Sequence, residues 1–415
     1  MPNCLIKNEK IMKTKSSFQT FKNCLTKNSN VMKRLISVLV AVMFMTGMVV
    51  AQSNESDVEQ EGTGHEATVN QNGSSNTSNI VQDQGFNYDL DRGSKAEVDQ
   101  DGSSNSSDIN SWGWNHEVYV TQNGSENASA ISQSGGENDA YVDQIGDKNI
   151  LRGKSEGSAA YQKAGDPFGN DKNYFDVDQT GNENTVGMWQ EHSAEAVVNQ
   201  NGDKNLTEIY QSGPAYGDDN TANVVINGDE NMTDVHQFGD GNSATLNVGH
   251  ANYAPSNYSN EAAIKQTGNS NDASFDLQKG ANNNADIDQN GDNNYTELSV
   301  KYGNDNEAVV DVDGDANRSR ISVSTQWGDM SDGNQINLTQ DGYQNYASGD
   351  IEGDNNDIDV LQQGDYNRVG TSWYTKDGFD VMGNNNTIDI EQMSNSNKSL
   401  NSVVGNSNSI NVSQH

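Results

Sequence analysis

The sequence predicts an all-β solenoid in which strand–turn–strand arches of about 22 residues per coil stack into a cross-β, amyloid-like column. Three observations predict it. The pattern Gln-x-Gly-x-x-Asn occurs thirteen times, and the copies at Gln122, Gln133 and Gln144 follow one another at eleven-residue intervals. Apolar and polar residues alternate between the copies. The apolar residues are mostly Ala, Val and Ile, which suit a thin core between two strands.

The strand of each half-repeat is defined by this alternation. Between Asn138 and Ile145, successive residues point to opposite faces of an extended strand. We expect one face to turn inward and the other outward. The inward set is Asn138, Ala140, Val142 and Gln144, and the outward set is Asp139, Tyr141, Asp143 and Ile145.

The turn of each half-repeat begins at a glycine. Gly146 and the two residues after it form the turn, and Asn149 opens the next strand. Glycine allows positive φ, and a neighbouring Asp or Asn side chain can hydrogen-bond to the local backbone. Nine turns accordingly have the sequence Gly-Asp-x-Asn, for example Gly228 to Asn231.

The inward amides are predicted to form ladders. Arches stacked about 4.8 Å apart place each inward Gln and Asn above another, and an amide both donates and accepts along such a column. A buried Gln without partners costs about 1–3 kcal/mol, so a single coil should be unstable and the stack cooperative. The predicted ladder and turn residues are Gln71, Gly73, Asn76, Gln122, Gly124, Asn127, Gln133, Gly135, Asn138, Gln144, Gly146, Asn149, Gln200, Gly202, Asn205, Gln237, Gly239, Asn242, Gln266, Gly268, Asn271, Gln289, Gly291, Asn294, Gln340, Gly342, Asn345, Gln362, Gly364 and Asn367.

Composition limits the function. The 415 residues include Lys+Arg 24 and Asp+Glu 60, for a formal charge of −36, and only 32% of them are hydrophobic. So acidic a surface excludes nucleic acid as a natural partner. Outward acids are instead expected to keep monomers apart and to blunt exposed strand edges.

No catalytic, cofactor-binding or metal-binding residue is predicted, and we expect the chain not to be an enzyme. The six histidines do not stand at metal-ligand or catalytic spacing, and we expect them to face solvent. The Gly-Asp-x-Asn turns lack the nonapeptide of calcium β-rolls, so they are interpreted as turn formers with weak divalent cation binding.

The first 51 residues differ from the rest. They carry eight Lys/Arg and one acid, and both cysteines, Cys4 and Cys24. Lys33-Arg34 followed by an apolar run and the small residues before Gln52 predict a secretory signal peptide over residues 32–51. We expect residues 1–31 to be a mis-called leader, translation to start at Met32, and residues 52–415 to form the repeat solenoid.

Interruptions of the period are expected near 85–95, 151–172, 213–219, 249–259, 328–333 and 370–382. Pro167, Pro214 and Pro255 lie inside them and in none of the predicted strands, since a strand interior needs its backbone N–H groups.

The repeat resembles the curlin repeat of curli-type functional amyloids, whose units have approximately the pattern Ser-x5-Gln-x-Gly-x-Gly-Asn-x-Ala-x3-Gln. Residues Gln237 to Ala244 match its centre, although Val248 stands where the closing Gln is expected. Elsewhere the second Gly is usually replaced. The resemblance implies an exported subunit of a Gram-negative-type bacterium, secreted through an outer-membrane pore and nucleated into extracellular cross-β fibres of biofilm matrix.

The sequence therefore predicts a structural fibre subunit that self-assembles and contributes to biofilm matrix, surface adhesion and cell aggregation. The alternatives are a monomeric calcium- or glycan-binding secreted solenoid, or a minor nucleator subunit. Scattered aromatics such as Trp112, Trp114, Trp189, Trp327 and Trp373 are candidates for glycan contact or for cross-strand packing. An ice-binding solenoid, or a β-helix enzyme with its site in an interruption, fits the pattern less well.

Overall fold

The computed structural model describes residues 53–84, 93–164, 172–213, 219–249, 257–323, 331–370 and 378–415. All belong to one compact unit, Ser53–His415. The predicted leader and signal peptide, Trp327, Trp373, the three prolines named above and most of the predicted interruptions lie outside the described residues.

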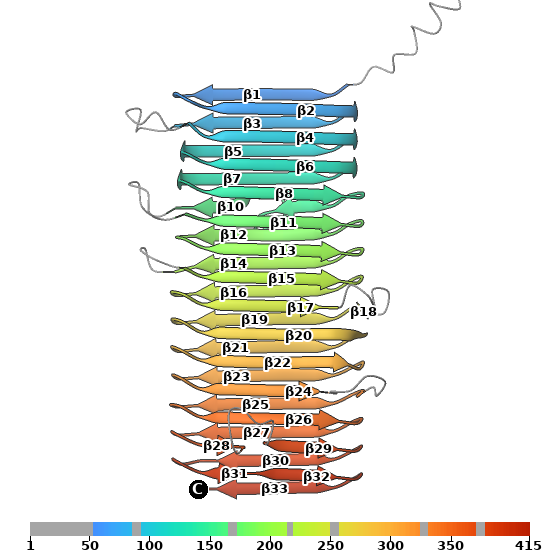
Figure 1. The fold of residues 1–415 in the computed structure, drawn as a ribbon, viewed down its shortest axis with the longest axis vertical. Coiled ribbons are helices and arrows are strands. Elements are labelled where there is room, and N and C mark those ends of the chain that lie inside the picture. The colour runs from blue at the N-terminus through green and yellow to red at the C-terminus, as the bar shows by residue number, and fades with distance from the viewer. Residues whose placement is uncertain are drawn as a thin grey trace, which may run out of the picture. The chain divides into compact units, whose positions relative to one another are not determined.

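The unit is a β-solenoid, as predicted, with two parallel sheets facing each other (Figure 1). The chain alternates between the sheets, so each half-repeat contributes one strand to one of them. The first sheet contains β1 (Glu55–Glu61), β3 (Thr77–Asp83), β5 (Ser106–Trp114), β7 (Ala128–Gly136), β9 (Ile150–Arg152), β10 (Ala160–Lys163), β12 (Thr185–Glu191), β14 (Leu206–Ser212), β16 (Met232–Phe238), β19 (Glu261–Thr267), β21 (Asn284–Asn290), β23 (Glu307–Asp313), β25 (Gln335–Asp341), β27 (Asp357–Gln363), β30 (Thr387–Gln392) and β33 (Ser409–Gln414).

The second sheet is built in the same way from the intervening half-repeats. It contains β2 (Glu66–Ser74), β4 (Lys95–Ser103), β6 (Glu117–Ser125), β8 (Asp139–Ile145), β11 (Tyr174–Thr180), β13 (Glu195–Asn201), β15 (Thr221–Asn227), β17 (Ser243–Val248), β20 (Asp272–Ala281), β22 (Tyr295–Tyr302), β24 (Arg318–Val323), β26 (Tyr346–Glu352), β28 (Arg368–Val369), β29 (Phe379–Met382), β31 (Lys398–Ser399) and β32 (Asn401–Val404). The short β18 (Asn257–Tyr258) pairs with the end of β20.

Strands of successive coils pair in parallel and in register. Lys95 lies opposite Glu117, and Glu117 lies opposite Asp139, so an uninterrupted coil advances by 22 residues. Insertions lengthen single coils without shifting the register. Val118, Ala140 and Phe175, for example, stack at the same inward position of the second sheet, although an insertion separates Ala140 from Phe175.

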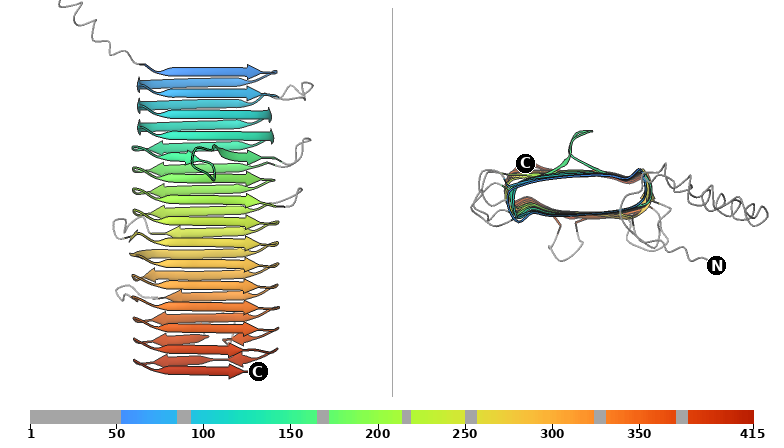
Figure 2. Two further views of the ribbon diagram at one scale, coloured as in Figure 1. Left: turned by 180° about the vertical axis from the view of Figure 1, so that it is seen from behind. Right: turned by 90° about the horizontal axis from the view of Figure 1, so that it is seen from above.

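The core is a thin layer between the sheets. End-on, each coil is a flattened loop with two long sides and a narrow interior (Figure 2). In β6 the inward Val118, Val120 and Gln122 are buried while the residues between them are partly exposed, which is the alternation that the sequence predicts.

The turns contain two residues with positive φ. Gly124 has φ +131°, and a Cβ atom there would lie 1.9 Å from the carbonyl oxygen of Gly146 in the next coil. Positive φ and this close stacking both require glycine. Two residues later Glu126 has φ +60°, and the residue before most ladder asparagines adopts the same left-handed conformation. The sequence does not reveal this second position, because Ser, Glu, Lys and Asn all occupy it.

Each coil contributes one level, that is one strand's place, to each sheet. Some levels are occupied by two short strands instead of one long strand. β9 and β10 both pair with β7 and β12, and the chain leaves the sheet between them at Gly153–Ala159. Similarly, β28 and β29 both pair with β26. Within the described ranges, no helix is long and apolar enough to cross a membrane.

Candidate assembly interface

One glutamine ladder runs through the N-terminal half of the second sheet. Each side-chain Nε2 donates to the Oε1 of the glutamine in the next coil, at 2.8–3.0 Å. The same Nε2 also donates to a backbone carbonyl of the opposite sheet, as Gln122 does to Ser106 O at 3.0 Å. Each carboxamide therefore joins both neighbouring coils and both sheets. The members are Gln71, Gln100, Gln122, Gln144, Gln179 and Gln200.

The glutamine ladder of the first sheet extends over most of the column. It starts at Gln60, which donates to Gln82 Oε1 at 2.7 Å, and it ends at Gln414, which accepts from Gln392 at 2.8 Å. Ser111 and Val312 occupy two of its places, and the Ser111 hydroxyl donates to Gln133 Oε1 at 3.0 Å. The predicted residues in it are Gln133, Gln237, Gln266, Gln289, Gln340 and Gln362.

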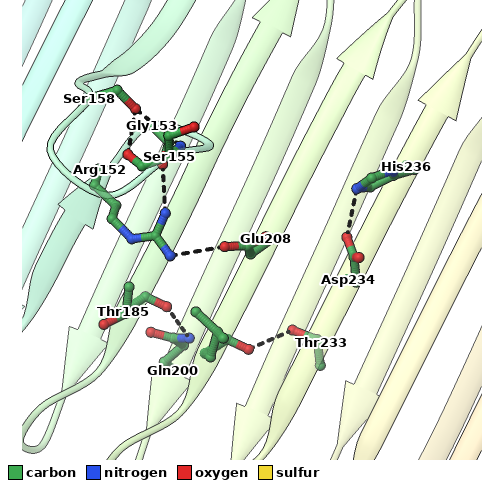
Figure 3. Close-up of polar contacts among 11 residues, drawn as sticks. Arg152, Gly153, Ser155, Ser158, Thr185, Gln200, Glu208, Thr233, Asp234 and His236 are labelled. Atoms are coloured by element: carbon green, nitrogen blue, oxygen red, sulfur yellow. Dashed lines mark hydrogen bonds and ion pairs between the residues drawn. The ribbon is translucent and has the colours of Figure 1, made fainter.

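The glutamine ladder of the second sheet ends at Gln200. The Nε2 atom of Gln200 donates to Thr185 O at 3.2 Å (Figure 3). It also donates to Thr207 Oγ1 at 3.0 Å, and no glutamine follows it in the ladder. The corresponding places in later coils are aliphatic: Ile226, Val248, Leu277, Val300, Val323, Ile351, Val381 and Val403.

The glutamine of one copy of the sequence motif lies outside the glutamine ladders. Gln278 opens a Gln-x-Gly-x-x-Asn motif, but Leu277 takes the inward place and Gln278 points outward to Asp276 at 3.1 Å. An extra residue before Gly280 shifts the motif, which is why the glycine spacing there is twelve.

Asparagine ladders stand beside the glutamine ladders. Asn127 donates from Nδ2 to Gly146 O at 2.7 Å, and its Oδ1 accepts the backbone N–H of Asn149 at 2.9 Å. Its own backbone N–H donates to Asn105 Oδ1 at 3.1 Å. The asparagine thus hydrogen-bonds to the turn of the next coil and to the asparagine of the preceding coil, so it links three coils. All predicted asparagines, from Asn76 to Asn367, are at most 1% exposed.

The expectation that the histidines face solvent is wrong for two of them. His116 is 0% exposed and His192 is 9% exposed. His116 replaces an asparagine in the ladder: its Nε2 lies 3.2 Å from Trp112 O, and its Nδ1 accepts the backbone N–H of Asn138 at 3.3 Å. Burial lowers the pKa of His116 to about 4. An imidazole can take the asparagine's place because it offers a donor and an acceptor at similar positions.

The turn aspartates form a third kind of ladder. Asp147 Oδ1 accepts the backbone N–H of Ser125 at 2.8 Å, and Asp203 Oδ1 accepts that of Asn182 at 2.7 Å. These carboxylates therefore serve as backbone acceptors between coils. The described residues contain no group of three or more His, Cys, Asp or Glu side chains placed to hold a metal ion.

Outward carboxylates come close together on both sheets. Burial raises the pKa of Asp143, and the neighbouring Asp176 raises it further. Burial and then Asp288 raise the pKa of Asp286 in the same way. Outward carboxylates of neighbouring positions therefore repel one another along the stack.

The outward aromatic side chains of the described residues stack along the column. The rings of Tyr119 and Tyr141 lie 5.1 Å apart at an angle of 7°, and those of Tyr161 and Trp189 lie 4.4 Å apart. Outward rings of successive coils thus contact one another, as cross-strand packing predicts. Trp112 is 45% exposed, whereas Trp114 is 3% exposed.

The segment Gly153–Ala159 stands out from the first sheet (Figure 2). Arg152 at its base donates to Gly153 O and reaches Glu208 at 2.9 Å (Figure 3). Beside it lies an open hollow of ≈ 710 Å³, lined by residues that include Ala130, Arg152 and Leu206.

The curlin associated repeat family matches the chain at five places, residues 52–83, 115–146, 280–314, 332–364 and 383–415. The chain carries curlin repeats at these five places. No curated protein matches it. Its repeats are those of a curli-type fibre subunit family, which is structural rather than enzymatic.

The structure extends the curlin-repeat architecture beyond the matched segments. Residues 147–279 separate the second match from the third, yet β11 to β19 in this stretch continue both sheets in the same register. What this stretch shares with the matched repeats is the alternating strand and the buried asparagine, although the motif around them varies.

Proposed function

We propose that this curlin-repeat protein is an exported subunit of an extracellular curli-like fibre that contributes to biofilm matrix, surface adhesion and cell aggregation. The observation that carries the proposal is that the glutamine and asparagine ladders of the first sheet reach both ends of the column, where the strands β1 and β33 are open. Every residue of β1 is exposed, and in β33 the outward residues are exposed and the inward ones half-buried. An unpaired strand edge is a template for another chain.

Export rests on the signal-like segment 32–51, and secretion through an outer-membrane pore with help from a nucleator subunit rests on the curlin family. The glutamine and asparagine ladders carry assembly in this proposal, and the turn glycines allow the arches to stack. No residue has a catalytic role. Weak divalent cation binding follows from the charge density alone.

The test is incubation of purified residues 52–415 at neutral pH, followed with thioflavin T and X-ray fibre diffraction. Fibres with a meridional spacing of about 4.8 Å are expected. A persistently soluble, β-rich monomer would contradict the proposal and favour a stand-alone binding solenoid. Folding that requires calcium would point to a calcium-binding solenoid.

A further inference from the structure

The first and last strands of the column lie in the same sheet. β1 and β33 are the two ends of the first sheet, whereas β2 and β31/β32 end the second (Figure 1). Among the described residues, the first sheet has fifteen levels, with β9 and β10 sharing one, and the second sheet has fourteen. The described part of the column, from β1 to β33, therefore contains an odd number of half-repeats.

This parity decides how a second copy can continue the column. If the next copy were stacked without rotation, its β1 would pair with β33, but one strand would be missing from the second sheet between β32 and the next β2. The second sheet would then have a gap at every junction while the first sheet continued, and the backbone groups beside each gap would be left unpaired. A half-turn about the long axis exchanges the two sheets and removes the gap.

Resting on the proposed fibre, we infer that successive copies stack head to tail and are related by a half-turn about the column axis. β33 then pairs with β2 of the next copy, and β31/β32 pair with its β1. The resulting column alternates between the two sheets without a break, since the last strand of one copy is followed by a strand of the opposite sheet.

The apolar side chains of β33 and β2 match in this arrangement. Four apolar residues pack on the core yet stay partly exposed, and they are Ala67 and Val69 at one end and Ile410 and Val412 at the other. With the in-register pairing of every other level, Ile410 stacks on Ala67 and Val412 on Val69. Without rotation, Ile410 would instead face Ser56, and Ala67 and Val69 would face the gap.

The ladders also continue. Gln414 is placed to donate to Oε1 of Gln71 in the next copy, because each glutamine ladder donates from Nε2 toward the C-terminal end. Asn397 and Asn408 then accept the backbone N–H groups of Asn54 and His65, the next copy's first residues in the two asparagine ladders.

Charge favours joining opposite ends. β1 carries Glu55, Asp57, Glu59 and Glu61, so two N-terminal ends repel each other. The outward residues of β33 are Ser409, Asn411 and Ser413, and Lys398 of β31 comes to lie beside Glu55 of the next copy. The junction thus places neutral or basic residues against the acidic end.

Paired cysteines test the half-turn. The chain from Gln52 onward contains every described strand and has no cysteine. Ser409→Cys with Glu66→Cys places two thiols side by side only in the half-turn junction, and Ser409→Cys with Glu55→Cys does so only in the unrotated one. Both double variants lose one carboxylate, so they are matched in charge.

The expected result is that fibres of the first variant, once oxidised, run as covalent multimers on a non-reducing gel, while those of the second remain monomers. Adjacent strands bring Cα atoms to about 5 Å, within disulfide range. The reverse pattern, or fibres in which neither variant cross-links, overturns the half-turn. If the unsubstituted chain forms no fibres, the proposed fibre function fails instead.

Helical reconstruction of unsubstituted fibres gives a second measurement that needs no substitution. The half-turn predicts a rotation of 180° per subunit beyond the twist of the solenoid, and a rise of about 70 Å, from 14.5 levels of about 4.8 Å. A subunit repeat without that rotation overturns the inference.

Discussion

A buried carboxamide in this stack is held by residues one coil away rather than by its neighbours in the chain. Gln144 accepts from Gln122 and donates to Gln179, both at 2.8 Å. Removing this amide therefore takes a partner from a donor in the preceding coil and from an acceptor in the next coil. The cost is larger than that of losing one hydrogen bond.

Gln144→Ala is expected to destabilise the column by about 1–3 kcal/mol, because it leaves the buried Gln179 Oε1 without this donor and Gln122 Nε2 with one hydrogen bond fewer. The matched control is Gln278→Ala, which alters the same sequence motif at an outward position and should change stability by less than about 0.5 kcal/mol. Denaturant unfolding of both variants measures the difference. Equal effects would mean that the ladder does not contribute to stability.

His116 makes the N-terminal part of the column sensitive to acid. Its pKa is about 4 in the fold because of burial, below the ordinary 6.5, so the folded chain holds it neutral. The unfolded chain takes up the proton first as the pH falls, so stability is present above pH 6.5 and is lost toward pH 4. Protonation would also set an N–H on Nδ1 against the backbone N–H of Asn138.

His116→Asn is expected to remove this loss, because asparagine makes the same two contacts without titrating. Between pH 7 and pH 4.5 the unsubstituted chain should lose up to about 3 kcal/mol more than the variant. Outward carboxylates such as Asp143, with raised pKa values, shift stability in the opposite direction in both proteins and cancel in the comparison. An unchanged difference between the two pH values would refute the role of His116.

At the scale of the element, each half-repeat is a strand followed by a turn, and the close contact between turns of successive coils fixes the position of the strand. Gly124 combines positive φ with a carbonyl oxygen from the next coil where a Cβ would be. Gly157 in the protruding loop also has positive φ, +80°, but nothing lies within 4 Å of its Cβ position. Substituting each of the two glycines therefore distinguishes the energetic cost of backbone strain from the cost of a clash with the next coil.

Gly124→Ala is expected to cost more than about 2 kcal/mol, from strain and from the clash with the next coil. Gly157→Ala should cost about 1 kcal/mol, from strain alone. Thermal or denaturant unfolding of the two variants tests the comparison, and a cost for Gly157→Ala as large as that for Gly124→Ala would show that stacking of the turns is unimportant.

At the scale of the whole molecule, a charge of −36 opposes association while the open ends favour it. Raising salt from low to moderate concentration should shorten the lag before fibres appear, because the Debye length falls to about 10 Å at 0.1 M. Thioflavin T kinetics at two salt concentrations give the lag directly. A lag that does not change with salt would mean that repulsion does not limit assembly.

The sequence by itself determined the half-repeat. Alternation marked the inward Ala, Val and Gln positions, and glycine with asparagine marked the turns, because these depend on backbone geometry within about eleven residues. The curlin family followed from the same local pattern.

Only the tertiary structure decided which copies of the motif enter a ladder and what surrounds them. Gln278 lies outside, His116 is buried in place of an asparagine, and aliphatic residues replace glutamine in the second sheet after Gln200. The partner of each inward side chain lies a whole coil away, at a separation that insertions change from level to level. Stacking across coils, and not the local pattern, therefore sets these environments and leaves β1 and β33 in the same sheet.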